Sequence, residues 1–132
     1  MRVIAVLGAV VVATAGGCAR GRSTLAGVYS LDQAAHGADV YAGMCVSCHA
    51  GMGNHVGPIF RARWAGTSLF QLYHFIRDNM PKDDPGSLAP EDCAAVVAYL
   101  LQLNGMPAGK TPLATDSLTL QAIRYDTLTT GH

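Results

Sequence analysis

Two cysteines and a histidine stand at a spacing that suits one particular chemistry. Cys45, Cys48 and His49 form the pattern C-x-x-C-H, which is typical of covalent haem attachment. On a helix the two thiols lie one turn apart, so they can add to the two vinyl groups at one edge of a porphyrin. The next residue then lies beneath the iron, where a neutral imidazole is a suitable ligand. We therefore expect one covalent c-type haem (haem c) whose iron is bound by His49.

Two other kinds of site also use a C-x-x-C pair. A thioredoxin-like redox site needs alternating strands and helices, and the sequence carries no strand pattern. A zinc site needs a second pair of ligands, but Cys93 stands alone and His55 and His74 do not pair at zinc spacing. Haem attachment is therefore the expected chemistry. Cys93 lies on an apolar helical stripe and is expected to be a small buried residue.

The residue on the other side of the iron decides between electron transfer and reactivity. Methionine raises the reduction potential and fills the site, whereas an open site admits small ligands. Met80 and Met106 both precede proline, so the local sequence does not choose between them. Met80 comes before the last long helix and can fold across the distal face, whereas Met106 follows that helix. Met80 is the expected sixth ligand, and the alternatives are Met52, Met106, His55 and His74.

Several other side chains have an ordinary interpretation beside a functional one. Trp64, the only tryptophan, is suited to donate its indole N–H to a haem propionate, and simple core packing explains it equally well. Arg61 and Arg63 are candidates for pairing with the same propionates, or are ordinary exposed loop residues. His74 is expected to be a polar residue at a helix edge. Met44 and Met52 are expected to pack in the core or at the haem edge, and the residues expected to face solvent are His36, His55 and His132.

Helical periodicity predicts the elements that position these residues. Residues 50–66 are rich in glycine and are expected to form a loop. The predicted helices are 31–47 after a Ser30-x-x-Gln33 capping box, a second from Thr67 or Ser68 to the residue before Pro81, a third over 90–103 that ends at Asn104-Gly105, and a short last helix capped by Asp116.

Length and composition limit the class of protein. A chain of 132 residues is one domain. Nine basic and nine acidic residues give a formal charge of zero, which argues against nucleic acid as a partner. No apolar run reaches the roughly 18 to 20 residues that a membrane-spanning helix needs. Helices this short are marginal alone, so a bound haem would supply the interior that the polypeptide lacks.

The first eighteen residues are typical of an export signal. A short basic start is followed by an apolar run and then by small residues that lead to Cys18. Ala15-Gly16-Gly17-Cys18 is similar to a bacterial lipoprotein signal, and Ala13-Thr14-Ala15 is an alternative cleavage site. We expect a periplasmic or periplasm-facing protein with a lipid on Cys18. The expected divisions are a signal over 1–18, a tether over 19–29 and one domain over 30–132.

Residues 30–124 resemble class I cytochromes c. The pattern Gly37-x-x-x-Tyr41-x-x-x-Cys45-x-x-Cys48-His49 is similar to that family's N-terminal helix, in which the glycine lets the C-terminal helix cross closely. Tyr99 matches the aromatic residue of that second helix. Gly57-Pro58-Ile59-Phe60 resembles the loop whose proline carbonyl accepts a hydrogen bond from the haem-binding histidine. The resemblance implies an all-α fold of three to four short helices around one haem, with Met80 at the family's ligand position and Pro58 as the acceptor for His49.

Other segments are similar to the small cytochrome domains found with quinoprotein alcohol dehydrogenases. The resemblance implies a one-electron carrier, not an enzyme, that passes electrons between a dehydrogenase or respiratory complex and a downstream acceptor. A quinoprotein dehydrogenase or a terminal oxidase is the expected redox partner, and a membrane is met only through the N-terminal lipid. The rival functions are a peroxidase or small-ligand sensor with a labile sixth ligand, and a zinc-binding interaction module. The similar segments are Leu72-Tyr73, Asn79-Met80-Pro81, Pro85-Gly86-Ser87-Leu88, Val97-Ala98-Tyr99-Leu100-Leu101 and Asn104-Gly105-Met106-Pro107-Ala108-Gly109.

Overall fold

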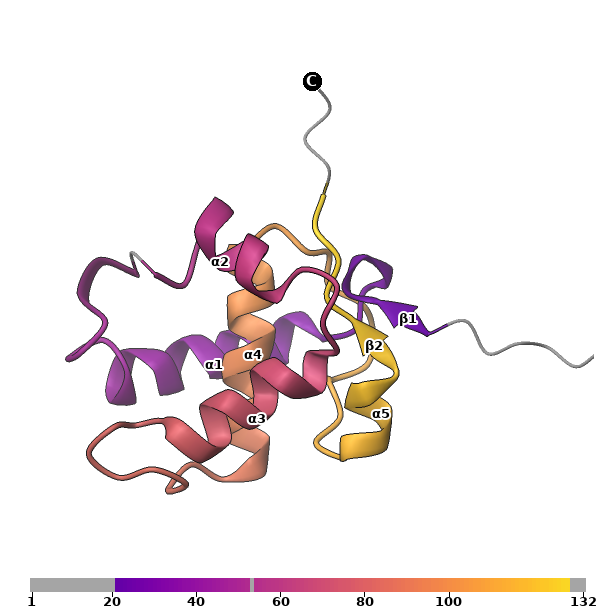
Figure 1. The fold of residues 1–132 in the computed structure, drawn as a ribbon. Helices are drawn as coiled ribbons and strands as arrows, with labels where there is room; N and C mark the ends of the chain where they lie inside the picture. The colour runs from indigo at the N-terminus through magenta and orange to yellow at the C-terminus, as the bar shows by residue number, and fades with distance from the viewer. Residues whose placement is uncertain (1–20, 53, 129–132) are drawn as a thin grey trace, which may run out of the picture.

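The computed structural model describes residues 21–52 and 54–128, and the described part is mostly helical (Figure 1). None of its helices is long and apolar enough to cross a membrane. The predicted signal over 1–18 and its Cys18 lie outside the described residues. The all-α fold expected from the sequence is confirmed. The elements are β1 (Arg22–Ser23), the 3₁₀ turn η1 (Thr24–Ala26), α1 (Leu31–Met44), the 3₁₀ turn η2 (Ala50–Met52), α2 (Pro58–Trp64), α3 (Leu69–Asn79), α4 (Pro90–Leu103), α5 (Ser117–Gln121) and β2 (Ile123–Arg124).

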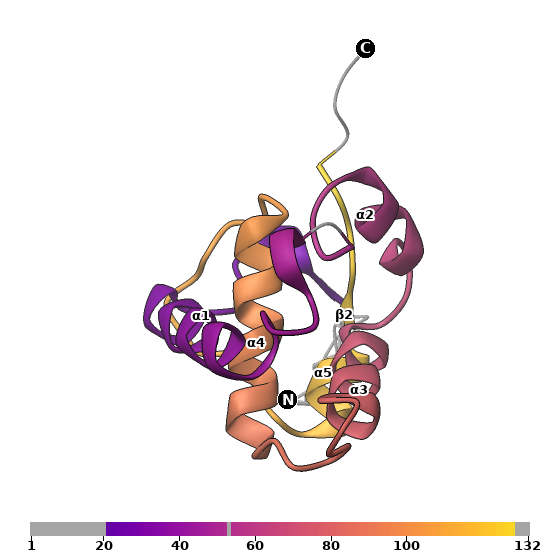
Figure 2. The ribbon, with the colours of Figure 1, turned by 90° about the vertical axis from the view of Figure 1, so that its left-hand side faces the viewer.

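The two longest helices, α1 and α4, cross at a buried glycine. In Figure 2, α1 lies on one side of α4, and α2, α3 and α5 lie on the other. A Cβ atom at Gly37 would overlap the carbonyl oxygen of Ala95 and press on the Tyr99 side chain. Beside the crossing, the rings of Tyr41 and Tyr99 pack with their centres 5.6 Å apart. The close crossing that the resemblance implied is therefore confirmed.

The start of α1 follows the prediction only in part. The Ser30 hydroxyl accepts a hydrogen bond from the Gln33 N–H at 3.2 Å, as an N-cap should. The Gln33 side chain does not complete a capping box. Its amide instead donates to the Leu113 carbonyl at 3.0 Å and accepts from the Leu113 N–H at 2.6 Å. Gln33 therefore connects α1 to the segment that follows α4.

The end of α1 comes earlier than the predicted residue 47. The helix ends at Met44, and Cys45 is its C-cap. The backbone then turns, because the N–H groups of Cys48 and His49 both donate to the Cys45 carbonyl, at 3.1 and 2.9 Å. The haem motif is therefore a set of tight turns at the end of α1 and not its last helical residues.

The expectation that residues 50–66 form a loop is wrong over α2. Pro58 is the first residue of this helix, where its missing N–H costs nothing and its fixed φ suits the helix. Gly57 precedes it with a φ of 89°, a backbone conformation that glycine adopts without strain. Phe60 and Trp64 lie one turn apart and are both buried. The helix forms because this pair packs against the core.

The remaining predicted helices are confirmed. Ser68 is the N-cap residue of α3, and Met80 is its C-cap just before Pro81. The bounds of α4 are those predicted, 90–103. The Asp116 carboxylate accepts a hydrogen bond from the Thr119 N–H at 2.8 Å and so caps α5.

The prediction that residues 19–29 form a tether is wrong for the described part. Arg22 pairs with Ile123 as β1 and β2 form a two-stranded parallel sheet. Val28 and Tyr29 are buried, and the Tyr29 hydroxyl donates to the Met106 carbonyl at 2.7 Å. Strands of two residues are too short to show an alternating pattern in the sequence. The segment after Gly21 is therefore part of the folded domain.

Candidate functional site

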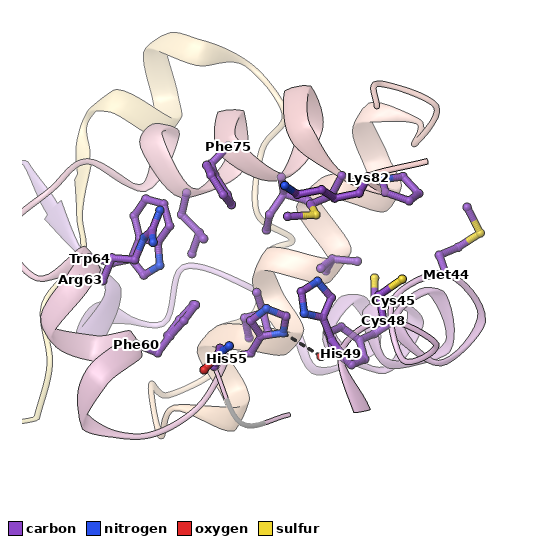
Figure 3. A pocket seen from close by; sticks show the side chains of 18 residues that line it. Met44, Cys45, Cys48, His49, His55, Phe60, Arg63, Trp64, Phe75 and Lys82 are labelled. Carbon is purple, nitrogen blue, oxygen red and sulfur yellow. Dashed lines mark hydrogen bonds between the residues drawn. The ribbon is translucent and has the colours of Figure 1, made fainter. Parts of the chain in front are cut away.

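A cavity of about 530 Å³ lies among α1, α2, α3 and α4 (Figure 3). Its size falls within the usual range for cofactor pockets, roughly 300 to 1,000 Å³. The cysteines of the haem motif lie toward one end of it, and Trp64 and Arg63 lie toward the other. The lining is mainly apolar and aromatic and consists of Tyr41, Met44, Cys45, Cys48, His49, Asn54, His55, Phe60, Arg63, Trp64, Leu72, Phe75, Ile76, Met80, Pro81, Lys82, Val96 and Leu100.

The three residues of the haem motif line one wall together. Cys45 is half-buried and Cys48 is exposed, and both are free thiols. The turn closed on the Cys45 carbonyl brings His49 to the same wall, where its ring is half-buried. Burial raises the pKa of the Cys45 thiol. Two thiols and an imidazole on one apolar wall are the set that attaches a haem and binds its iron.

Met80 lines the same cavity from the C-terminal end of α3, and its side chain is half-buried. Figure 3 shows Phe75, which lies on α3, across the cavity from His49. Met106 is buried in the core and does not line the cavity. His74 is exposed, stacks on Phe70 with ring centres 5.2 Å apart, and lies 3.1 Å from a carboxylate oxygen of Asp78. Among the predicted candidates for the sixth ligand, the Met52 side chain lies outside the described part of the structure.

His55 does not face solvent, so that prediction is wrong. Its ring is half-buried, lines the cavity, and lies with Nδ1 2.7 Å from the Tyr41 hydroxyl (dashed line in Figure 3). Burial, and secondarily the neighbouring His49, lower the pKa of His55. The ring centres of His49 and His55 are 4.3 Å apart. Rings this close cannot bind opposite faces of one iron. Each metal–nitrogen bond alone is about 2 Å long, and the centre of each ring lies further from the metal than its nitrogen does.

The far end of the cavity offers a hydrogen-bond donor and a cation. Trp64 is buried, and its indole Nε1 has no hydrogen-bond partner in the described structure. A buried unpaired N–H costs about 1–3 kcal/mol, so this donor favours a polar group in the cavity. The Arg63 guanidinium lies 5.1 Å from the Trp64 ring and 5.2 Å from the Phe75 ring. With thiols at one end and these groups at the other, the lining fits a haem with its propionates toward Trp64.

Arg61 and Pro58 do not line the cavity. Arg61 is half-buried. Burial raises the pKa of Tyr125 to about 12, and the positive charge of Arg61 offsets part of this rise. Pro58 is exposed at the start of α2, and no hydrogen bond joins it to the His49 ring within residues 21–52 and 54–128. The role of Pro58 as the acceptor for His49 stays a prediction.

Cys93 is the buried residue that the sequence predicts. Its side chain is fully buried on α4, and its thiol lies 3.9 Å from the Leu88 carbonyl oxygen. Burial raises its pKa to about 11, so the thiol is protonated and unreactive at neutral pH. Across the described ranges, no three His, Cys, Asp or Glu side chains gather as a zinc module would require.

Asn104 and Lys82 are functional candidates that the sequence analysis does not identify. Asn104 is buried, and its side chain donates to the carbonyl oxygens of His55 and Leu100, both at 2.8 Å. Its carboxamide oxygen accepts from the Gly57 N–H at 3.1 Å. Lys82 is exposed and lines the cavity (Figure 3). In the sequence, Asn104-Gly105 is a helix-stop signal, and such a signal does not predict hydrogen bonds to a distant loop.

Comparison with known families agrees with the site. The family model described as cytochrome C oxidase, cbb3-type, subunit III matches residues 32–100, about half of the chain. The match contains the haem motif, α2, α3 and Met80 and stops inside α4, whereas β1, α5 and β2 lie outside it. Neither a curated protein nor a solved structure matches the chain. The chain therefore belongs to the cbb3-type cytochrome c oxidase subunit III family, and is a monohaem c-type cytochrome that carries a covalently bound haem and transfers electrons.

Proposed function

We propose that this chain is a periplasmic one-electron carrier with His49 and Met80 as its axial ligands. The observation that carries the proposal is the cavity, which has Cys45, Cys48 and His49 on one wall and Met80 at the end of α3. When bound there, the haem supplies an iron that cycles between the ferric and ferrous states.

The described residues suit this role without a catalytic group. A methionine ligand raises the potential and leaves no open position for substrate. The apolar side chains Leu72, Ile76 and Leu100 line the cavity and would shield a bound haem from water, which keeps solvent reorganisation small when the charge changes. With a haem bound, the Trp64 N–H would donate a hydrogen bond to a propionate and the Arg63 guanidinium would offset the propionate's negative charge. These features support a carrier and not an enzyme.

The redox partner would dock where the thiols reach the surface. Cys48 is exposed there, and the flanking Met44 and Val46 are each 44% exposed. Electron-transfer encounters bury small areas and dissociate quickly. The family description names an oxidase subunit, which supports a terminal oxidase as a partner, and the resemblance to quinoprotein-associated cytochromes supports a dehydrogenase. Stopped-flow measurements of how fast a quinoprotein dehydrogenase reduces this protein, and of how fast a cbb3-type oxidase oxidises it, would rank these two partners.

Export and lipidation form part of the proposal. The apolar segment that ends at Cys18 is the sequence feature that supports them. In cells expressing the full chain, we expect labelled palmitate to be incorporated and the signal to be removed. Cys18→Ser should abolish labelling and leave haem attachment intact, and a chain that keeps residues 1–18 and stays inside the inner membrane would contradict the proposal.

The ligand assignment is tested by the optical spectrum. Protein matured with a cytochrome c assembly system should show covalent haem and the weak long-wavelength band of methionine bound to ferric iron. Met80→Ala should abolish that band and lower the potential, because it removes the thioether ligand that raises the potential. Met106→Ala is the matched control and should keep the band, since Met106 lies outside the cavity. Rapid, tight binding of cyanide or carbon monoxide by the unmodified protein would favour a ligand sensor or peroxidase instead.

A further inference from the structure

The segment between His49 and α2 is held by two distant helices. Within its described residues it contains one 3₁₀ turn, and α2 begins without a side-chain cap. Asn104, the C-cap of α4, supplies the missing contacts through its hydrogen bonds with the His55 carbonyl and the Gly57 N–H. Asn104 is 6% exposed, so these hydrogen bonds are shielded from water. The backbone at His55 therefore has a fixed position relative to α4.

The His55 ring is fixed as well. Tyr41 on α1 is 2% exposed, and its hydroxyl lies 2.7 Å from the Nδ1 atom of His55. The Phe60 ring of α2 lies 6.2 Å from the His55 ring, centre to centre, on an edge. Hydrogen bonds thus hold the residue at its ring and at its backbone. One further contact of the His55 ring is with His49.

That remaining contact reaches the expected iron ligand. The His49 and His55 ring centres are 4.3 Å apart, with the ring planes inclined by 53° (Figure 3). A ring packed at this distance would limit rotation of the His49 imidazole when that imidazole binds iron. Residues around a metal-bound histidine tune the metal through the orientation of that ring and its exposure to water.

We propose that Tyr41, His55 and Asn104 form a clamp that positions the His49 imidazole and thereby sets the reduction potential. The inference rests on the proposed role of His49 as an iron ligand. His55 acts as a positioning residue in this clamp and does not bind iron. The clamp joins α1 and α4, which cross at Gly37, to the wall of the cavity.

The test uses the full chain as matured holoprotein and three variants. His55→Leu removes the imidazole but keeps an apolar side chain of similar length. Tyr41→Phe removes only the hydroxyl that meets His55. Tyr99→Phe is the matched control, because its ring packs 5.6 Å from Tyr41 and its hydroxyl forms no hydrogen bond within the described ranges. The readouts are the electron paramagnetic resonance g-values of the ferric protein, which report the orientation of the axial imidazole, and the midpoint potential.

We expect His55→Leu to change the g-values and to shift the potential, because the His49 imidazole then loses the ring that limits its rotation. The Met80 band should persist, since the other axial ligand is untouched. Tyr41→Phe should produce a smaller change in the same direction, and Tyr99→Phe none.

A structural role alone gives a different pattern. If His55→Leu and Tyr41→Phe lower the free energy of unfolding but leave the g-values and the potential unchanged, the clamp does not position His49 and the proposal is overturned. If His55→Leu fails to fold, Tyr41→Phe against Tyr99→Phe decides the question by the same readouts. Failure of the proposed ligation is recognised separately, because the unmodified protein would then lack covalent haem or the methionine band.

Discussion

The crossing of α1 and α4 and the wall formed by residues 54–57 border the same cavity, but different forces hold them. The crossing is held by close apolar packing, with Gly37 against Ala95 and Tyr41 against Tyr99. The wall is held by two hydrogen bonds with the Asn104 side chain, which donates to the His55 carbonyl and accepts from the Gly57 N–H. Apolar packing tolerates no added volume, whereas a wall of this kind depends on individual donors and acceptors.

The crossing and the wall differ in their expected role in function as well as in what stabilises them. The crossing fixes the scaffold, and the wall carries His55, which lies against His49. A change at the crossing should therefore affect folding first. A change at the wall should affect the iron site more than it affects the fold.

The largest effect is expected at the crossing. Gly37→Ala places a Cβ against the backbone oxygen of Ala95, which no rotamer change can relieve, so the helices must separate. We expect a loss of about 3 kcal/mol or more in the free energy of unfolding, at or above the upper end of the usual cost of overpacking. A guanidinium titration of the ferric holoprotein followed by circular dichroism measures it.

Gly43 on the same helix provides the control. A Cβ at Gly43 would meet no atom within 4 Å, so Gly43→Ala should stabilise α1 by about 0.5–1 kcal/mol. Equal effects of the two substitutions would mean that the close crossing is not what holds the two helices.

The next effect is expected at the wall. Asn104→Ala leaves the His55 carbonyl and the Gly57 N–H without their partner, which should cost about 2 kcal/mol of unfolding free energy. Hydrogen exchange at the Gly57 amide should quicken more than exchange within α1. Gln102→Ala, at an exposed position of the same helix, is the control and should change neither quantity. Unchanged hydrogen exchange at the Gly57 amide in Asn104→Ala would show that residues 54–57 keep their structure without the Asn104 side chain.

The two regions also differ in how far the sequence predicts them. The haem motif, Ser30, Ser68 and Asp116 are local signals, and the structure places each of these caps where expected. The crossing at Gly37 follows from the family resemblance. These features depend on neighbours one helical turn away or on a known helix pair.

The features that the sequence analysis missed depend on contacts between distant residues. Tyr41 and His55 are 14 positions apart, and Asn104 and His55 are 49 positions apart, so no local period reveals either bond. His55 lies among glycines and for that reason looks like an exposed loop residue. The short α2 was missed because glycine content outweighed the Phe60 and Trp64 pair. Polar contacts across the fold become predictable only when the fold itself is known.

A smaller effect is expected where α1 meets the segment after α4. Gln33→Ala removes two hydrogen bonds to the Leu113 backbone, and we expect a loss of about 1–2 kcal/mol in the free energy of unfolding. Gln33→Glu keeps the acceptor for the Leu113 N–H but loses the donor. Its free energy of unfolding should therefore fall between those of the unmodified protein and Gln33→Ala. The potential should not change, because Gln33 does not line the cavity. A shifted potential in Gln33→Ala would weaken the separation between scaffold and iron site.

The smallest effect is expected at the cap of α5, and it depends on pH. Hydrogen bonds from the Thr119 backbone hold the pKa of Asp116 below its ordinary value of 3.8. A carboxyl whose folded pKa is depressed stabilises the fold above its unfolded pKa, and this stabilisation is lost as the pH falls through the folded value. Asp116→Asn keeps an N-cap side chain without the charge. The unmodified protein should therefore exceed Asp116→Asn in unfolding free energy slightly at neutral pH, and the difference should vanish below the depressed pKa. A difference that persists unchanged in acid would place its origin elsewhere than in the Asp116 charge.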